Sequence, residues 1–301
     1  MGTGLALGGG ELAAPRARPG TPARPFLKWA GGKGQLLDEI VRRFPLDVEP
    51  KRYVEPFVGG GAVFFWVRQN LPRVRCRIVD RNVALIETYQ VVRDAVDGLV
   101  AALRSHAEQH TAQHYYAVRQ HQPDQWIERA ARFIYLNRTC YNGLWRVNRG
   151  GRFNVPLGRY KNPRILDEDN LRRVASVLQG VEILAQDFEE AVHDCGRGDW
   201  VYFDPPYQPL SSTSRFTAYT SEGFDLDAQK RLARTFEHLS REGAFAILSN
   251  SDVDPVPRLY EKLCPRPILD RVRMSRSINS NGARRGPIDE LLIYSSGTDH
   301  Q

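Results

Sequence analysis

Short apolar runs alternate along this chain with longer stretches whose apolar residues recur at helical spacing. The runs at 52–57 and 75–79 read as strands, whereas Leu232, Phe236 and Leu239 recur as on one face of a helix. Such alternation predicts an α/β fold with a doubly wound, mostly parallel sheet covered by helices. Further strands are expected at 181–185, 200–203 and 244–248, with a terminal antiparallel hairpin formed by 268–274 and 290–295.

The region 91–180 breaks this alternation. It is largely helical in pattern, polar, and rich in His and Gln, and it follows the second expected strand. We therefore expect an inserted domain at 91–180, with the main domain formed by 25–90 and 181–301. Residues 1–24 are rich in Gly, Ala, Pro and Arg without a continuous apolar run, which predicts a disordered tail and not a signal peptide.

Composition narrows the class of protein. The chain has 301 residues, of which 42% are hydrophobic, and carries 42 basic against 35 acidic residues, a net charge of +7. Seven basic residues and no acidic one lie between 138 and 164, a segment suited to a polyanionic partner. The four cysteines are widely separated, which favours a reducing cytoplasm over a disulfide framework. No apolar run approaches the ~18 residues that would span a membrane.

The tetrapeptide Asp204-Pro205-Pro206-Tyr207 follows the expected strand 200–203, so it should lie where open α/β sheets bind ligands. An exocyclic amine on a nucleobase is a poor nucleophile, because its lone pair is delocalised into the ring. The Asp204 carboxylate and the Pro205 carbonyl could accept hydrogen bonds from such an amine and stabilise the charge that develops during its methylation. Pro205 and Pro206 stiffen the turn, and the Tyr207 ring offers a face to an extruded base. Alone, the tetrapeptide also fits an ordinary turn.

A glycine run at 59–61 separates strand 52–57 from an expected helix at 62–68. Glycine permits close backbone approach to a ligand, and Asp80, at the end of the next strand, has the position of an acidic residue that binds ribose hydroxyls. Phe64 replaces the third glycine of a dinucleotide fingerprint, which disfavours a pyrophosphate-bearing cofactor and favours S-adenosylmethionine. The glycine run by itself is equally compatible with a plain tight turn.

The segment 26–33 contains Ala-Gly-Gly-Lys and superficially resembles a phosphate-binding loop. No glycine stands five residues before Gly32, and Gly34 replaces the Ser or Thr that would hold magnesium, so a nucleotide triphosphatase is disfavoured. The alternative is an N-terminal capping segment in which Trp29 packs.

A second hairpin is expected within the basic segment, where 144–148 and 152–155 flank Arg149-Gly150-Gly151. Arg146 could bind a guanine edge through two parallel hydrogen bonds. Phosphate contacts are expected from the other basic side chains of the segment: Arg138, Arg149, Arg152, Arg159 and Lys161. Tyr141 and Asn142 precede the hairpin, where an aromatic wedge could fill the gap left by an extruded base. A solvated basic loop is the alternative for any single arginine.

Taken together, these blocks resemble the Dam-type (D12 class) DNA adenine N6-methyltransferases, which use S-adenosylmethionine. The resemblance runs from Phe26 to about Tyr294 and preserves the order of the motifs. The matching blocks are Lys-Trp-Ala-Gly-Gly-Lys at 28–33, Glu-Pro-Phe-Val-Gly at 55–59, Asp-Arg-Asn at 80–82, Tyr-Asn-Gly-Leu at 141–144, Phe-Asn-Val-Pro-Leu-Gly at 153–158, Asp-Phe at 187–188, Asp-Pro-Pro-Tyr at 204–207 and Leu-Ser-Asn at 248–250.

The resemblance implies a Rossmann-like catalytic domain, a target-recognition domain at 91–180 and roles for particular residues. The matching positions expected to line the methyl-donor site are Trp29, Ala30, Gly31, Lys33, Glu55, Phe57, Gly59, Asp80 and Asp204, with Asp187 and Phe188 holding the donor's adenine. Those matching the recognition and wedge positions are Tyr141, Asn142, Leu144, Arg146 and Pro156, with Lys28 near the first guanine. Methylation of adenine in double-stranded GATC is the implied activity, in a monomer associated with the nucleoid.

Two features, and the function itself, remain open to other interpretations. His106, His110 and His114 stand four residues apart, but without H-E-x-x-H or further ligands they predict a solvated helix face and no metal site. Residues 208–223 are expected to form a loop that closes over the base, with an inert surface loop as the alternative. Other functions to be weighed are a methyltransferase of a restriction-modification system with another site, a non-catalytic DNA-binding regulator, and a nicotinamide-dependent oxidoreductase.

Overall fold

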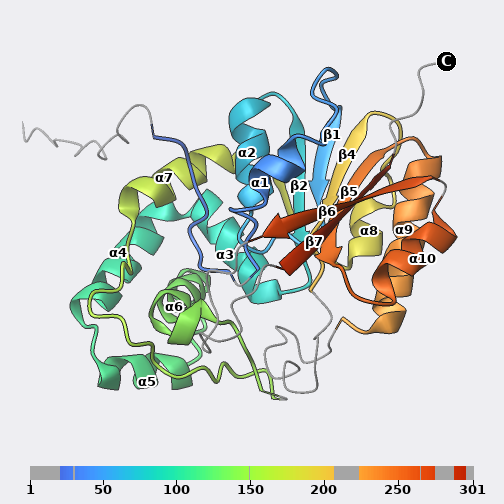
Figure 1. Cartoon of the computed structure of the whole chain (residues 1–301). Helices are drawn as coiled ribbons and strands as arrows, with labels where there is room; N and C mark the ends of the chain where they lie inside the picture. The colour runs from blue at the N-terminus through green and yellow to red at the C-terminus, as the bar shows by residue number, and fades with distance from the viewer. Residues whose placement is uncertain are drawn as a thin grey trace, which may run out of the picture.

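A mixed β-sheet forms the centre of the protein. The computed structural model describes residues 21–29, 31–148, 150–206, 224–264, 266–274 and 288–295. Within them, seven strands pair in the order β3-β2-β1-β4-β5-β7-β6 (Figure 1). Their bounds are β1 Arg52–Glu55, β2 Arg75–Asp80, β3 Glu182–Ala185, β4 Asp199–Phe203, β5 Phe245–Ser251, β6 Pro267–Met274 and β7 Ile288–Ser295.

The pairing confirms the predicted fold class. Strands β1 to β5 pair in parallel, and β7 pairs antiparallel with both β5 and β6. The terminal hairpin therefore extends the sheet, with β7 inserted between β5 and β6. Strand β1 ends at Glu55, two residues earlier than expected, because Pro56 has no N–H to donate to a neighbouring strand.

Alternate residues of each strand face opposite sides of the sheet, and both sides are covered by helices (Figure 1). Tyr53 and Tyr202 pack into one apolar cluster, whereas Val54 and Phe203 pack into the other. The first cluster contains residues of α2 (Ala62–Asn70) and α3 (Val83–Asp94), together with Ile40 of α1 (Leu37–Val41). The second contains residues of α8 (Phe188–Val192), α9 (Leu226–Arg241) and α10 (Val256–Leu263). This arrangement is the doubly wound sheet that the sequence predicts.

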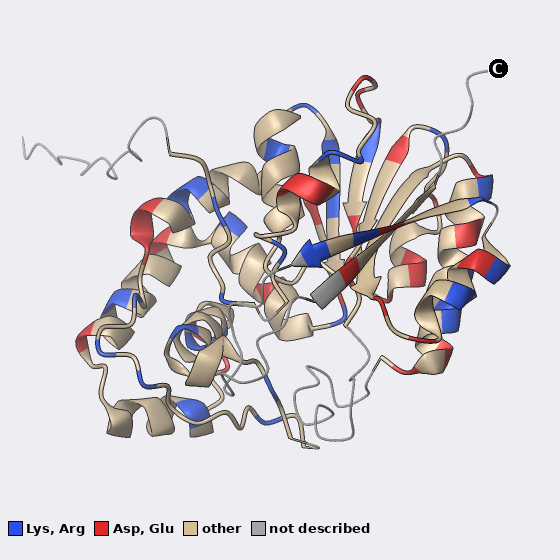
Figure 2. Cartoon of the chain, viewed as in Figure 1, with Lys and Arg blue, Asp and Glu red and all other residues tan. Residues whose placement is uncertain are grey.

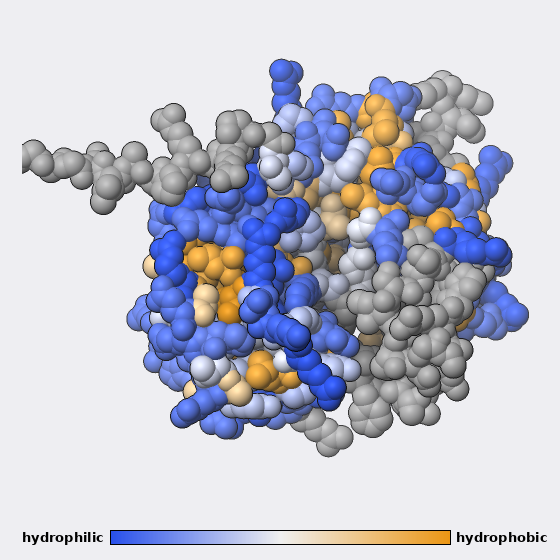
Figure 3. Space-filling model, turned by 60° about the vertical axis from the view of Figure 1, so that its left-hand side comes forward, coloured by the Kyte–Doolittle hydropathy of each residue, from blue (hydrophilic) through white to orange (hydrophobic). Residues whose placement is uncertain are grey.

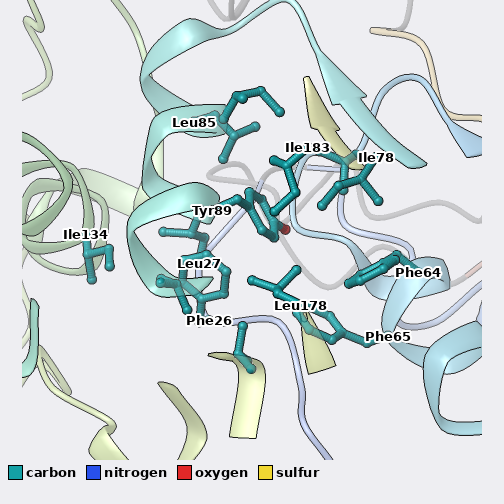
Figure 4. Close-up of a cluster of buried hydrophobic side chains, with 14 of the residues drawn as sticks. Phe26, Leu27, Phe64, Phe65, Ile78, Leu85, Tyr89, Ile134, Leu178 and Ile183 are labelled. Carbon is teal, nitrogen blue, oxygen red and sulfur yellow. The ribbon is translucent and has the colours of Figure 1, made fainter. Parts of the chain in front are cut away.

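The region between β2 and β3 forms a helical lobe beside the sheet (Figure 1). Its helices are α4 Val96–Glu108, α5 Ala112–Gln120, α6 Trp126–Thr139 and α7 Glu168–Val177, with a short 3₁₀ turn at Tyr141–Gly143. Leu85 and Tyr89 of α3 lie between the two parts, with Phe64 on the sheet side and Ile134 of α6 on the lobe side (Figure 4). The lobe therefore shares one continuous apolar core with the sheet, which fixes its position relative to the strands.

The described chain begins within the region expected to be a tail. Ala23 is buried in the core, and the Arg24 guanidinium lies 2.7 Å from the Asp167 carboxylate just before α7. The Arg24 backbone N–H also donates to the Asn170 side chain at 3.1 Å. Residues 23 and 24 thus belong to the packed fold, while residues 1–20 of the expected tail lie outside the described residues.

The cysteines and the hydropathy of the surface do not narrow the class of protein further. The four cysteines are free and buried. No helix of the described chain has the length and apolar character needed to cross a membrane. On the face shown in Figure 3, hydrophilic residues separate the apolar areas from one another.

Candidate active site

Three acidic residues stand at the carboxyl ends of neighbouring parallel strands. Glu55 is the last residue of β1, Asp80 is the last residue of β2, and Asp204 directly follows β4. The strand order reverses direction between β1 and β4. The carboxyl ends of these two strands are therefore the topological switch point, where open α/β sheets bind ligands.

Asp204 is held by contacts to two other segments. Its Oδ1 lies 3.1 Å from the Lys33 ammonium and accepts a hydrogen bond of 3.1 Å from the Ser249 hydroxyl. Burial raises the pKa of the Asp204 carboxyl, and the positive charge of Lys33 acts in the opposite direction. Pro205 is buried and Pro206 half-buried, whereas Tyr207 and the expected closing loop at 208–223 lie outside the described residues.

The Lys33 ammonium lies close to two carboxylates, those of Asp204 and Glu290. The Lys33 side chain is only 6% exposed, and its Nζ lies 3.7 Å from Glu290 Oε2 on β7 as well as close to Asp204. Glu55, at the end of the neighbouring strand β1, is buried and accepts a 2.6 Å hydrogen bond from the Tyr53 hydroxyl. Burial raises the pKa of Glu55 to about 8, so this carboxyl is mostly protonated at neutral pH and adds little negative charge to the site.

The glycine run holds Trp29 against the start of α2. A Cβ on Gly59 would lie 2.7 Å from Trp29 Nε1, and one on Gly60 would lie 3.2 Å from Trp29 Cβ. Gly61 has φ +71°, and a Cβ there would lie 2.9 Å from the Tyr89 hydroxyl. The groups that approach the backbone of these glycines closely are therefore the side chains of Trp29 and Tyr89. The contact of Trp29 brings the segment 26–33 next to the carboxyl end of β1.

Asp80 is fixed by backbone amides at the end of β2. It accepts hydrogen bonds from Asn82 N–H at 2.9 Å and from Gly59 N–H at 3.3 Å. Burial raises its pKa to about 6, against the effect of those two amides. The bond to Gly59 ties the Asp80 carboxylate to the glycine run, so the two predicted halves of the donor site are adjacent.

Aromatic rings form a wall on the other face of the sheet. Phe188 is buried, with its ring centroid 5.5 Å from that of Phe57, and Phe224 meets Phe57 edge-to-face at 5.8 Å. Asp187 caps α8 by accepting from the Glu189 N–H at 3.1 Å. An apolar wall beside a hydrogen-bond acceptor suits a flat, amine-bearing ring.

Most of the predicted DNA-binding residues belong to the irregular stretch between α6 and α7, along which basic positions are spaced (Figure 2). Tyr141, Asn142, Arg159 and Tyr160 line an open hollow. The Lys28 ammonium lies over the Tyr160 ring, 3.7 Å from its centroid. Lys28 is also tied to α6, because its backbone N–H donates to the Asn137 side chain at 2.8 Å.

The expected hairpin has a single bridge, which pairs Val147 with Phe153. The turn is closed by the Asn148 side chain, which accepts from the N–H groups of Gly150 and Arg152 at 3.0 Å. Arg149, the remaining turn residue, lies outside the described residues.

The side chains predicted to contact DNA differ in their surroundings. Arg146 Nε donates a 2.8 Å hydrogen bond to the Asn154 amide oxygen, which holds the Nε side of the Arg146 guanidinium in place. Arg138 is half-buried and donates to the Phe26 carbonyl at 2.6 Å, and Leu144 is half-buried. Arg152, Pro156, Arg159 and Lys161 are exposed.

A comparison with known families decides the class of protein. Residues 29–275 match the sequence profile of the D12 class N6 adenine-specific DNA methyltransferases. The chain belongs to this family. It is an adenine-specific DNA methyltransferase, and its substrate is DNA.

Relatives of this methyltransferase carry two kinds of name. The type II methyltransferase M.MjaIII of Methanocaldococcus jannaschii is 44% identical over 288 residues, which cover 90% of this chain and 98% of the relative. The type II methyltransferase M1.LlaDCHI of Lactococcus lactis subsp. cremoris is 38% identical over 91% of this chain and 96% of its own. The DNA adenine methylase of Escherichia coli K12 is 39% identical over 279 residues, 91% of this chain and 96% of the relative.

Several residues that contact the candidate site were not predicted from the sequence. Arg231 of α9 lies 2.7 Å from Asp187 Oδ1 and 4.9 Å from the centre of the Phe188 ring. Ser249 lies in a block quoted for the family resemblance, but its role could not be assigned without its contact to Asp204. Glu290 and Phe224 are brought to the site only by the sheet pairing and by the packing of the segment before α9.

The three histidines correct one expectation. They do not share a helix, because α4 ends at Glu108 and Thr111 caps a new helix by accepting from His114 N–H at 3.0 Å. His106 Nδ1 lies 3.0 Å from His114 Nε2, and His110 Nδ1 lies 2.8 Å from the Tyr135 hydroxyl. Burial lowers the pKa of His106 to about 4. The described part of the chain has no group of three or more His, Cys, Asp or Glu side chains placed to hold a metal.

Proposed function

We propose that this enzyme transfers a methyl group from S-adenosylmethionine to N6 of an adenine turned out of double-stranded DNA, within GATC. The observation that carries the proposal is the carboxylate of Asp204, fixed by Lys33 and Ser249 at the carboxyl end of β4. Membership of an adenine-N6 family makes an exocyclic amine the nucleophile, and this carboxylate is its acceptor.

The chemistry required of the protein is stabilisation of a developing charge. Bound S-adenosylmethionine would supply a methyl group activated by its sulfonium. The methyl C–S bond would break as the C–N bond to N6 forms, S-adenosylhomocysteine would leave, and the positive charge gained by N6 would be relieved by loss of one amine proton. Asp204 accepts one amine N–H and the Pro205 carbonyl accepts the other, which draws electron density onto the nitrogen. Both acceptors are stiffened by Pro205 and Pro206, so little reorganisation is needed during the reaction. Tyr207 is assigned the stacking face for the base.

The donor is assigned to the opposite flank of the same edge. The Asp80 carboxylate accepts hydrogen bonds from two backbone N–H groups and would also accept hydrogen bonds from the ribose hydroxyls of the donor. Phe188 and Phe57 would contact the adenine ring, with Asp187 accepting from its amine. The remaining lining positions are Trp29, Ala30, Gly31, Lys33, Glu55 and Gly59. Phe64, at the position of the third glycine of a dinucleotide fingerprint, favours a donor without pyrophosphate.

Target recognition is assigned to the helical lobe, residues 91–180, with the catalytic domain formed by 25–90 and 181–301. Arg146, held by Asn154, is the residue expected to read a guanine edge, with Leu144 and Pro156 beside it and Lys28 near the first guanine. Tyr141 and Asn142 are assigned to the wedge that replaces the extruded base, an assignment supported by the open hollow that they line. Arg138 and Arg159 are assigned to contacts with DNA phosphates. The enzyme is proposed to act as a monomer.

A second candidate differs only in the target. Two relatives, 44% and 38% identical, are named type II methyltransferases, which supports a restriction-modification enzyme as the second candidate, with its recognition sequence to be found by experiment. The relative from Escherichia coli K12, at 39% identity, is named a DNA adenine methylase, which supports adenine as the target base. The assignment of GATC itself is based on the resemblance of the motifs.

Mapping of N6-methyladenine in DNA treated with the purified protein separates these candidates. Unmethylated plasmid is incubated with S-adenosylmethionine and sequenced by a method that detects modified bases, with Asp204→Asn as the inactive control. We expect modification of adenine at every GATC and nowhere else. Modification at another fixed sequence would replace the GATC assignment with the second candidate, and absence of N6-methyladenine would contradict both.

A further inference from the structure

We propose that Ser249, itself oriented by Tyr202, is a positioning residue that turns the second carboxylate oxygen of Asp204 toward the target amine. The inference deepens the proposed function and depends on its assignment of Asp204 as the acceptor. Neither Ser249 nor Tyr202 contacts the substrate in this account, since both act through Asp204.

Strand pairing brings the three residues together. Tyr202 on β4 pairs with Ile247 on β5. Because alternate residues of a strand face the same side, Ser249 lies one step further along the face that carries Tyr202. The Tyr202 and Ser249 hydroxyls are 2.9 Å apart, and Ser249 Oγ is 3.1 Å from Asp204 Oδ1. Tyr202 and Ser249 are both buried, so water cannot replace either bond cheaply.

The direction of both hydrogen bonds follows from the number of protons. An ionised carboxylate only accepts, so the single hydroxyl proton of Ser249 must be donated to Asp204. The Ser249 oxygen is then left to accept, and the Tyr202 hydroxyl must be the donor to it. The chain therefore runs from Tyr202 to Ser249 to Asp204, and each bond polarises the next.

Both fixed contacts of the carboxylate converge on one oxygen. Lys33 Nζ and Ser249 Oγ each lie 3.1 Å from Oδ1, and no described residue is placed to bond Oδ2. Asp204 is half-buried, so the unengaged oxygen is the one available to a ligand. Burial raises the pKa of Asp204, and the hydrogen bond from Ser249 acts in the opposite direction, favouring the ionised carboxylate.

The test uses full-length enzyme, a duplex that contains the mapped target site, and three variants: Ser249→Ala, Tyr202→Phe and the double substitution. Ser251→Ala is the matched control, since it removes the same hydroxyl from the same strand, and Ser251 Oγ has no hydrogen-bond partner among the described residues. Single-turnover methyl transfer is measured from acidic to neutral pH, together with the affinities for DNA and S-adenosylmethionine and the melting temperature.

We expect Ser249→Ala to lower the single-turnover rate by roughly tenfold or more, the usual effect of losing a hydrogen bond to a charged group, with both affinities nearly unchanged. The acid limb of the pH–rate profile of Ser249→Ala should move to higher pH, because the variant lacks a hydrogen bond that lowers the pKa of Asp204. Tyr202→Phe should lose about threefold, and the double variant should match Ser249→Ala, because Tyr202 acts through Ser249. The Ser251→Ala variant should behave as wild type.

Four outcomes would overturn the inference: a Ser249→Ala rate within about twofold of wild type, an unmoved acid limb, multiplicative losses in the double variant, or an equal loss in Ser251→Ala. Asp204→Asn is run in parallel. If that variant keeps wild-type turnover, the proposed function of Asp204 fails. If it is inactive while Ser249→Ala is unaffected, only the positioning role fails.

Discussion

The Lys33 ammonium lies 3.1 Å from Asp204 Oδ1, which joins the N-terminal segment to the carboxyl end of β4. The contact depends on the glycine run, because side chains at Gly59 and Gly60 would displace Trp29 and with it the segment that carries Lys33. One ion pair thus links two motifs far apart in sequence, and it places a positive charge beside a carboxylate whose burial disfavours ionisation.

Replacing Lys33 should shift the pH dependence of methyl transfer. The charge of Lys33 lowers the pKa of Asp204, so Lys33→Met should raise that pKa and reduce the ionised fraction. The acid limb of the single-turnover rate should therefore move to higher pH, with a lower rate at neutral pH. Lys51→Met, at an exposed lysine just before β1, is the matched control. An unchanged acid limb in Lys33→Met would show that Asp204 does not govern this titration.

Donor affinity should fall in mild acid because of Asp80. Burial raises the pKa of Asp80 to about 6, so the carboxylate gains a proton as the pH falls through 6 and loses an acceptor for the ribose hydroxyls. Calorimetric titration with S-adenosylmethionine should show weaker binding below this pH. Asp80→Asn should bind weakly at all pH values, with no such step. A wild-type step that persists in Asp80→Asn would assign the titration to another group.

Arg231 should matter for the donor and not for DNA. It lies 2.7 Å from Asp187 Oδ1 and 2.6 Å from Glu189, with its guanidinium over the Phe188 ring. Arg231→Gln should weaken S-adenosylmethionine binding by roughly threefold to tenfold, as expected for a partly exposed charged hydrogen bond. Arg234→Gln, an exposed arginine on the same helix, is the control. Equal donor affinities for the two variants would remove Arg231 from the donor site.

Arg146→Ala should relax sequence choice more than it weakens DNA binding. A bidentate guanine contact is worth about 1–3 kcal/mol, so discrimination at one base pair should fall by roughly tenfold to a hundredfold. Asn154→Ala should show a smaller loss, because Asn154 only orients Arg146. Arg152→Ala, if Arg152 meets a phosphate, should weaken all duplexes alike and reduce the salt slope by about one.

Methylation rates on GATC and its single-base variants, at two salt concentrations, provide the comparison for these three variants. Equal losses on every duplex for Arg146→Ala would make Arg146 a phosphate contact.

Much of the fold was predictable because its signals are local. Apolar runs ended by glycine or proline mark strands, and the spacing of Leu232, Phe236 and Leu239 marks α9. The histidine prediction failed because Thr111, a side chain able to cap a helix, was not recognised as the start of α5. The insertion of β7 between β5 and β6 depends on pairing over long sequence separations, which no local pattern specifies.

The site was predictable as a set of motifs but not as a set of contacts. Asp204, Asp80 and Lys33 were identified from the chemistry and family resemblance of their segments. The partners that orient them were not: Ser249 and Glu290 are ordinary strand residues until pairing brings them to Asp204 and Lys33. The glycine run shows the same limit, since the close approach it permits is that of Trp29, a contact across 30 residues of chain.

Methyl transfer should depend on the charge of the Asp204 carboxylate, and Asp204→Asn removes that charge while preserving the shape of the side chain. Single-turnover transfer of a radiolabelled methyl group to a duplex containing the target is measured for wild type and variant, after both are shown to bind DNA and S-adenosylmethionine. We predict a loss of ~10²–10³ or more in rate, as for removal of one positioned electrostatic group, with both affinities retained. A variant that binds both ligands and keeps more than about a tenth of the wild-type rate would contradict the assignment of Asp204.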